Sequence, residues 1–225
     1  MVAIFSVQKT TLQDFPDKIA AIVFLAGCNF RCVYCHNPAA INGKPNVSEK
    51  EFFAFLESRT GKLQGIVVSG GEPTIYPDLP EFISKIKQMG FLAKLDTNGS
   101  NPEMLEKLFS RRLLDYVAMD VKAPFAKYPA ISAVRGMTAK LKKSIRLVMR
   151  SKVDYEFKTT VHPSLSRTDL LAVGKYIKGA KRFFLQHYVD EVTLNPQKHL
   201  AVYDDSALQK IALELKPFVG EIHVR

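Results

Sequence analysis

Short apolar runs alternate with longer stretches of helical periodicity along most of this chain. The runs are too continuously apolar for strands with one wet face, so they predict parallel strands that are covered by helices. The strand-then-helix unit occurs about six times, which predicts an α/β fold, but periodicity does not distinguish an open sheet from a barrel. In both, catalytic groups lie at the carboxyl ends of the strands. Strands are expected at residues 20–25, 65–69, 91–96, 116–120, 155–161, 182–186 and 221–224.

Local capping signals predict where the helices between these strands begin. Ser48 and Glu51 have the spacing of a capping box, so a helix is expected to start at Ser48. Asn101 followed by Pro102 is typical of an N-cap and a first-turn proline. The remaining helices are expected over residues 78–90, 138–149, 169–177 and 205–215.

The length and composition indicate one globular domain over residues 1–225, because 47% of the residues are apolar and no linker-like segment divides the chain. No apolar stretch reaches the 18 or more residues of a membrane-spanning helix, and the first 15 residues lack a basic leader followed by an apolar segment. We therefore expect a cytoplasmic protein that does not bind a membrane.

The formal net charge of +10 favours acidic partners or nucleic acid. Lys140, Lys143, Arg146 and Arg150 are spaced to line one face of an expected helix. That face is either a docking surface for an acidic protein or RNA, or simply a solvated outer face. No aromatic residues are interleaved with the basic ones as in an RNA-binding surface, so nucleic acid is not the expected partner.

The three cysteines of the chain lie within eight residues, in a C-x3-C-x2-C loop that follows the first expected strand. Three thiolates on one short loop can hold three corners of a [4Fe-4S] cluster, which usually has four cysteine ligands, and so leave one iron open. The alternative is a zinc site, which requires a fourth protein ligand. His36 is the nearby candidate, but it directly follows Cys35 and is poorly spaced for a tetrahedron.

This loop, with Cys28, Cys32 and Cys35 and an aromatic residue before the last cysteine, resembles the signature of the radical S-adenosylmethionine (SAM) superfamily. The resemblance implies a partial (β/α)6 TIM-like barrel. It also implies a [4Fe-4S] cluster whose open iron binds the amino and carboxylate groups of SAM, and reductive cleavage of SAM to a 5′-deoxyadenosyl radical. Tyr34 and His36 are expected to lie next to the bound SAM, Tyr34 at the adenine.

The end of the second expected strand is similar to the G-G-E-P motif of the same superfamily. Gly70, Gly71 and Glu72 are therefore expected beside SAM, with their backbone hydrogen-bonded to its ammonium group. Paired glycines allow a backbone to approach a ligand that a Cβ atom would block. The alternative interpretation is an ordinary turn.

The third and fourth expected strands end in D-T-N-G and D-V-K, and here the resemblance narrows to the activating enzymes of glycyl-radical proteins. It implies that Asp120, Val121 and Lys122 contact the ribose and carboxylate of SAM. The alternatives are a plain turn at the first segment and a surface ion pair, which contributes little, at the second. The resemblance also implies a monovalent cation held by Asp96, Thr97, Asp120 and the carbonyl group of Ala118.

The same resemblance implies that two further residues contact SAM. Lys158, in the fifth expected strand, occupies a place where relatives often carry Arg against the SAM carboxylate. His187 follows the sixth strand, near a histidine that relatives use beside the ribose. A histidine at a strand end is as often structural as functional. His162 departs from the pattern of the relatives, which usually have an apolar residue there.

Residues 8–20, together with the cysteine loop, resemble the activating proteins of anaerobic ribonucleotide reductases. The expected protein substrate is therefore that glycyl-radical enzyme. Because the chain has no further cysteines for a second cluster, the electron donor is expected to be an external flavodoxin or ferredoxin. The loops after the second to fourth strands are short, which is expected to leave the site open to a peptide. The alternatives are a radical SAM enzyme that modifies a small molecule or a tRNA base, and a non-catalytic iron-sulfur carrier or redox sensor.

Overall fold

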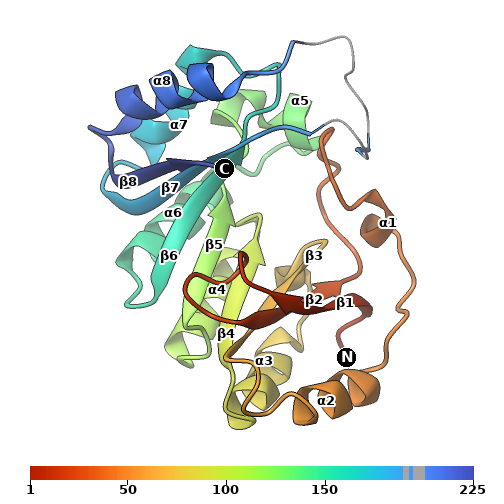
Figure 1. Ribbon diagram of the computed structural model, residues 1–225. Coiled ribbons are helices and arrows are strands. Elements are labelled where there is room, and N and C mark those ends of the chain that lie inside the picture. The colour runs from red at the N-terminus through yellow and green to blue at the C-terminus, as the bar shows by residue number, and fades with distance from the viewer. Residues whose placement is uncertain (190–192, 195–200) are drawn as a thin grey trace.

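In the computed structural model, which describes residues 1–189, 193–194 and 201–225, the strands form one curved sheet (Figure 1). The strands lie in chain order from β1 to β8. β1 pairs with β2 in antiparallel fashion, and each later strand pairs in parallel with the one before it. The strands are β1 (Ile4–Thr11), β2 (Ala20–Leu25), β3 (Gly65–Gly70), β4 (Leu92–Thr97), β5 (Tyr116–Asp120), β6 (Asp154–Thr160), β7 (Ala180–Gln186) and β8 (Val219–Val224).

The longer helices follow the outer side of this sheet (Figure 1). No helix of the described residues is long and apolar enough to cross a membrane. The helices are α1 (Pro38–Ile41), α2 (Glu49–Glu57), α3 (Leu79–Gln88), α4 (Pro102–Ser110), α5 (Tyr128–Ser132), α6 (Thr138–Arg150), α7 (Arg167–Tyr176) and α8 (Asp205–Leu215), with single 3-10 turns at Pro73–Ile75 (η1) and Phe125–Lys127 (η2).

The main core lies between the sheet and these helices, and α3 illustrates how it forms. Leu79, Phe82, Ile83 and Ile86 recur at helical spacing and are all buried. They belong to the same apolar cluster as the outward-facing side chains of the strands, such as Val68. Burying one such side chain contributes about 1.5 to 3 kcal/mol to the free energy of folding. This packing fixes the strands whose ends carry the site.

The inner side of the sheet is apolar at the amino ends of β2 and β3 and polar toward the carboxyl ends of the strands. Phe15, from the loop after β1, packs there against Ile22, Val67 and Tyr116 in a second small apolar cluster. Further along the strands the inward positions carry lysines and carboxylates. One group of charged side chains therefore lies at the carboxyl end, as the strand pattern predicts, and a second, with Asp154, Glu156 and Arg182, lies at the amino ends of β6 and β7.

The α/β partial barrel is confirmed, with one strand that the sequence analysis missed. Buried and exposed residues do not alternate regularly along β1. Its pairing with β2 shifts register between Ile4 and Ser6 and again between Gln8 and Thr11. Helix α7 begins at Arg167, two residues before the predicted start. The short helices α1 and α5 were also not predicted. The other elements match their predicted ranges to within two residues, apart from helix ends.

Candidate functional site

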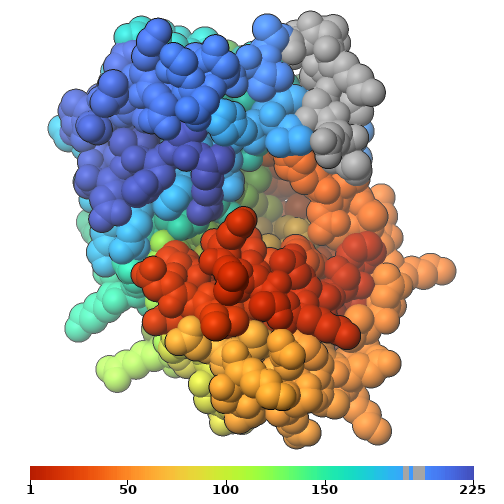
Figure 2. All heavy atoms as spheres, in the orientation of Figure 1, coloured from red at the N-terminus to blue at the C-terminus, as the bar shows by residue number. Residues whose placement is uncertain are grey.

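The carboxyl ends of β2 to β7 surround a cavity of about 270 Å³. Figure 2 shows the molecule hollowed between the N-terminal hairpin in red and the C-terminal strands in blue. All three cysteines line the cavity. The other residues that the sequence analysis assigned to the site and that line it are Tyr34, His36, Gly70, Gly71, Glu72, Asp96, Thr97, Asp120, Lys122 and Lys158.

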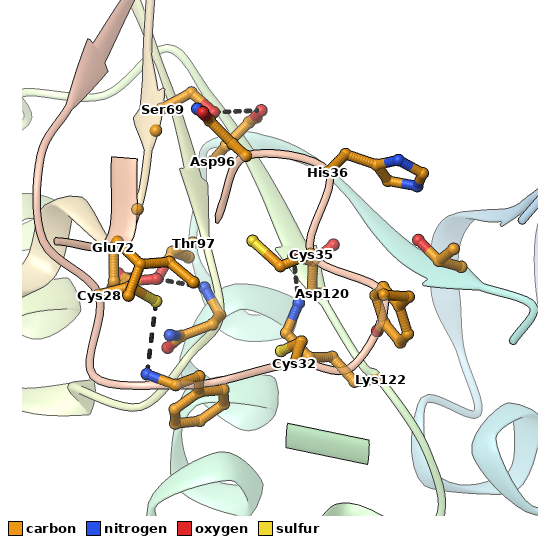
Figure 3. A pocket seen from close by; sticks show the side chains of 18 of the residues that line it. Cys28, Cys32, Cys35, His36, Ser69, Glu72, Asp96, Thr97, Asp120 and Lys122 are labelled. Carbon is orange, nitrogen blue, oxygen red and sulfur yellow. Dashed lines mark hydrogen bonds and ion pairs between the residues drawn. The ribbon is translucent and has the colours of Figure 1, made fainter. Parts of the chain in front are cut away.

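The three thiols are free, Cys32 buried and Cys28 and Cys35 half-buried. The backbone N–H of Phe30 donates to Cys28 Sγ at 3.4 Å. Burial raises the pKa of Cys28 to about 11, and it raises the pKa of Cys32 although Lys122 opposes it. Both thiols therefore stay neutral unless a metal group takes up their charge. Figure 3 shows Cys28 beside Glu72, and Cys32 beside Lys122.

Three cysteine thiols in one cavity, with no fourth cysteine in the sequence, fit a [4Fe-4S] cluster that has one open iron. Within the described part of the chain, no three His, Cys, Asp or Glu side chains are grouped so as to hold a single metal ion.

The cysteine loop is held in place by a segment distant in sequence. The N–H groups of Arg31 and Val33 donate to the carbonyl groups of Ser132 and Ile131, each at 3.0 Å. Cys32, between them, is thereby fixed against α5. The loop has little regular structure of its own, so its shape depends on these contacts.

The glycine pair brings the end of β3 against the start of the cysteine loop. The N–H of Gly71 donates to the carbonyl of Leu25, and that of Glu72 to the carbonyl of Gly27. A Cβ atom on Gly71 would lie 1.9 Å from the Gly27 oxygen, and Gly70 has a φ of +115°. Both glycines are required by this packing. A bound ammonium group only donates hydrogen bonds, so backbone carbonyl oxygens of this segment would have to accept from it.

Asp120 and Lys122 form an ion pair inside the cavity. Lys122 Nζ donates to Asp120 Oδ2 at 2.9 Å and lies 5.7 Å from the centre of the Tyr34 ring. Burial lowers the pKa of Lys122, but Asp120, Tyr34 and Cys32 together outweigh burial, and the pKa lies well above its ordinary value. The pair is therefore ionised at neutral pH. Val121 points the other way and is fully buried in the core.

Asp96 is surrounded by donors from three strands. Ser69 Oγ donates to its Oδ2 at 3.2 Å, and the ammonium groups of Lys94 and Lys158 lie 3.2 and 3.6 Å from its oxygens. Burial opposes ionisation, but the two lysines outweigh it and lower the pKa of Asp96. Thr97, the next residue, instead directs its hydroxyl to Glu72 at 2.7 Å.

The sequence analysis missed Lys94 and Asn29, which support the site. Lys94 shares the inner face of β4 with Asp96, and the period of two along the strand is the signal that could have found it. Asn29 ties the cysteine loop to the end of β4, because its side chain donates to Ser100 at 2.8 Å and accepts from Asn98 at 3.0 Å. No local pattern marks such a contact between loops.

The histidines differ in their placement. His36 lines the cavity but keeps much of its surface exposed. Desolvation of its ring by the surrounding residues lowers its pKa. His162 is buried outside the lining, with its ring 5.8 Å from that of Tyr34 and 5.1 Å from that of Tyr188. His187 is not among the lining residues, and its Nε2 lies 3.4 Å from Asp205. Ala118 is likewise buried outside the lining.

The basic face of α6 is divided between packing and solvent. Lys143 pairs with Glu103 and Glu106 of α4 at 3.2 and 3.4 Å, so it stabilises the contact between two helices. The exposed members are Lys140, Arg146 and Arg150. These contacts favour the interpretation as a solvated outer face.

A comparison with known families matches residues 22–177 to the radical SAM superfamily model. The chain belongs to the radical SAM superfamily. This membership makes it an enzyme and implies a [4Fe-4S] cluster and SAM, which the cavity's three thiols and charged groups fit.

Two sequence relatives and one solved structure illustrate this membership. A protein of Methanocaldococcus jannaschii, provisionally named a glycyl-radical enzyme activating enzyme, is 31% identical over 94% of this chain and 91% of its own length. The pyruvate formate-lyase-activating enzyme of Clostridium pasteurianum is 32% identical over 53% of this chain and 52% of its own. Streptococcus suis SuiB bound to S-adenosylmethionine has the same fold, with a TM-score of 0.68 and 14% identity over 88% of this chain and 48% of SuiB.

Proposed function

We propose that this radical SAM enzyme activates a glycyl-radical enzyme, and that its protein substrate is an anaerobic ribonucleotide reductase in the cytoplasm. One observation carries the proposal: three free thiols share a cavity with the ionised side chains of Asp120, Lys122 and Lys158, in a chain that matches an activating-enzyme relative over nearly its whole length. The reductase is favoured because residues 8–20 and the cysteine loop resemble the activating proteins of anaerobic ribonucleotide reductases.

The residues of the cavity have distinct parts in this proposal. Cys28, Cys32 and Cys35 hold the cluster, and Lys122 and Lys158 bring positive charge to the SAM carboxylate. Asp120 holds Lys122 in place at 2.9 Å. Bound there, a reduced cluster would supply the one electron for reductive cleavage of SAM to methionine and a 5′-deoxyadenosyl radical, and that radical would take a hydrogen atom from a glycine of the partner. The protein shields and aims that radical.

The electron comes from outside the chain. All three cysteines of the sequence line one cavity, so the chain's own thiols support one cluster and no second cluster for electron relay. We propose a flavodoxin or a ferredoxin as the donor.

The short loops after three of the strands support a site that is open to a peptide. After β3, β4 and β5 the chain reaches η1, α4 and η2 within a few residues. The connection from β7 to α8 contains residues 190–192 and 195–200, which lie outside the described residues. A small-molecule enzyme more often encloses its substrate to exclude water.

The test is electron paramagnetic resonance on anaerobic mixtures of reconstituted protein, SAM and a strong reductant. With the native reductase we expect a stable glycine-centred radical, and without it only slow formation of 5′-deoxyadenosine. Replacing the radical-bearing glycine of the reductase by alanine is the matched control and must remove the signal.

The same assay distinguishes the alternatives. Absence of the radical with the native reductase, together with rapid 5′-deoxyadenosine formation on adding a tRNA or a metabolite, would move the substrate to the small-molecule or RNA class. Failure to form 5′-deoxyadenosine with any reductant would support a cluster carrier or redox sensor. Such a protein has no evident use for the charged groups of the cavity.

A further inference from the structure

Lys158 lies between the two carboxylates expected to hold a monovalent cation. Its Nζ is 3.6 Å from Asp96 Oδ2 and 3.9 Å from Asp120 Oδ1. The side chain extends from β6, where the sheet register places Lys158 opposite Asp120, and only 12% of it is exposed. We infer that the Lys158 ammonium group takes the place of a monovalent cation in this site, so that SAM binding requires neither Na⁺ nor K⁺.

The other oxygens of the two carboxylates also have ammonium neighbours. Asp96 Oδ1 lies 3.2 Å from Lys94 Nζ, and Asp120 Oδ2 accepts from Lys122 Nζ at 2.9 Å. Each of the four carboxylate oxygens therefore has a lysine ammonium group within 3.9 Å, although Asp96 Oδ1 is buried and accepts no hydrogen bond. Two negative charges are already matched by three positive ones, and a metal cation would be repelled by the ammonium groups that contact the same oxygens.

The remaining groups expected to bind the cation are directed elsewhere. The hydroxyl of Thr97 donates to Glu72 at 2.7 Å and accepts from the N–H of Gly99. Ala118 is fully buried and does not line the cavity. The donor set for a monovalent cation is therefore not assembled, and the residues present do not fit that group.

The lysine remains charged in this position. Asp96 and Asp120 both lie within 3.9 Å of its Nζ, and two carboxylates at such distances favour the charged form of a lysine. The three lysines exceed the two carboxylates by one positive charge. That excess suits a ligand carboxylate, so one side chain can replace the cation and also attract the methionine part of SAM.

This inference rests on the proposed assignment of the cavity to SAM. The test measures the dissociation constant of SAM by equilibrium dialysis on the reconstituted protein. The buffers contain tetramethylammonium, Na⁺ or K⁺ as the sole monovalent cation, at equal ionic strength. For the unaltered protein we expect the same affinity in all three buffers.

The variant Lys158→Met removes the charge and leaves Asp96 and Asp120 in place. In tetramethylammonium it should bind SAM about tenfold more weakly or worse. Na⁺ or K⁺ should recover most of the affinity, because Asp96 Oδ2 and Asp120 Oδ1 then have no ammonium neighbour and can hold the ion by themselves. A second measurement needs no cofactor: the unfolding temperature of the cluster-free variant should rise when K⁺ replaces tetramethylammonium. Lys87→Met is the matched control, since Lys87 pairs with Asp115 at 2.6 Å outside the cavity. It should show no cation dependence.

Two results would overturn the inference, and only one of them would also overturn the proposed SAM site. If the unaltered protein binds SAM only with Na⁺ or K⁺ present, the inference is wrong while the SAM site stands. If the unaltered protein with an intact cluster binds no SAM in any buffer, the SAM site is wrong and the inference falls with it. Both comparisons use the unaltered protein, so they do not depend on the folding of the variant.

Discussion

The backbone N–H of Asn98 donates to Glu72 Oε2 at 2.6 Å, inside the protein. Glu72 is fully buried, and its other oxygen accepts from Thr97 and Thr74. Its carboxylate therefore joins the loop after β3 to the loop after β4. Burial raises its pKa, which the bond from Asn98 and the two threonine hydroxyls oppose. The side chain of the third G-G-E-P residue thus stabilises the cavity wall, while its backbone N–H donates to the carbonyl of Gly27.

Glu72→Gln should destabilise the protein. The side-chain NH₂ of the glutamine is a donor, and it would face buried groups, such as the Asn98 N–H, that now donate to the carboxylate. Leaving a buried donor unsatisfied costs about 1 to 3 kcal/mol in the free energy of unfolding. Urea denaturation of the cluster-free protein measures this. Glu81→Gln is the control, since Glu81 pairs with Arg111 at the surface and such pairs contribute about 0 to 1 kcal/mol. Equal losses in both variants would contradict the anchoring role of Glu72.

Gly71→Ala should displace the cysteine loop, because the added Cβ would lie 1.9 Å from the Gly27 oxygen. We expect a loss of about 1 to 3 kcal/mol or more in unfolding free energy, together with faster loss of the cluster in air. Gly61→Ala is the matched control, because Gly61 has a φ of +74° but no neighbour within 4 Å of the added Cβ atom. It should lose some stability and retain the cluster normally.

Replacing Cys28, Cys32 or Cys35 singly by Ala should abolish cluster binding and SAM cleavage. Each cysteine lines the same cavity, and no other cysteine in the sequence can substitute. Iron and sulfide analysis after anaerobic reconstitution should give one [4Fe-4S] cluster per unaltered chain. About one zinc per chain and no iron, after careful anaerobic handling, would refute the cluster assignment.

Asp120→Ala and Lys122→Ala should leave cluster content unchanged, since neither residue is a cluster ligand, but should weaken SAM cleavage. Losing a charged hydrogen bond to a buried ligand costs about 1.5 to 3 kcal/mol, or roughly tenfold to a hundredfold in rate. Circular dichroism must confirm that each variant is folded. Lys127→Ala removes a comparable pair with Asp169 outside the cavity and should cleave SAM normally. Unchanged cleavage in both site variants would remove this pair from the SAM site.

The sequence predicted those parts of the fold that depend on neighbours along the chain. The capping box of Ser48 and Glu51 and the N-cap of Asn101 are both present, because capping involves residues three apart. Ser166 and Asp169 form a capping box at the start of α7, and the sequence analysis did not predict it. β1 was missed because two register shifts in its pairing with β2 remove the alternation that marks a strand.

The cavity was predictable as a set of strand ends, but its internal contacts were not. The motifs indicated that Asp96, Asp120 and Lys158 would come together. The position of Lys158 between the two carboxylates depends on the register of adjacent strands, which no local pattern in the sequence reveals. The expectation for His187 rested on its place after β7, and the structure puts its ring against Asp205. Its role in SAM binding stays a prediction.

The hydrogen bonds from Arg31 and Val33 to Ser132 and Ile131 also set an order of events during synthesis. The cysteine loop leaves the ribosome about 100 residues before the segment that shapes it. At about 5 to 20 residues per second, the thiols spend roughly 5 to 20 seconds without their final geometry. The cluster therefore enters its ordered site late, after more than half of the chain has been made. Until then, all three thiols are exposed to stray metals and oxidants.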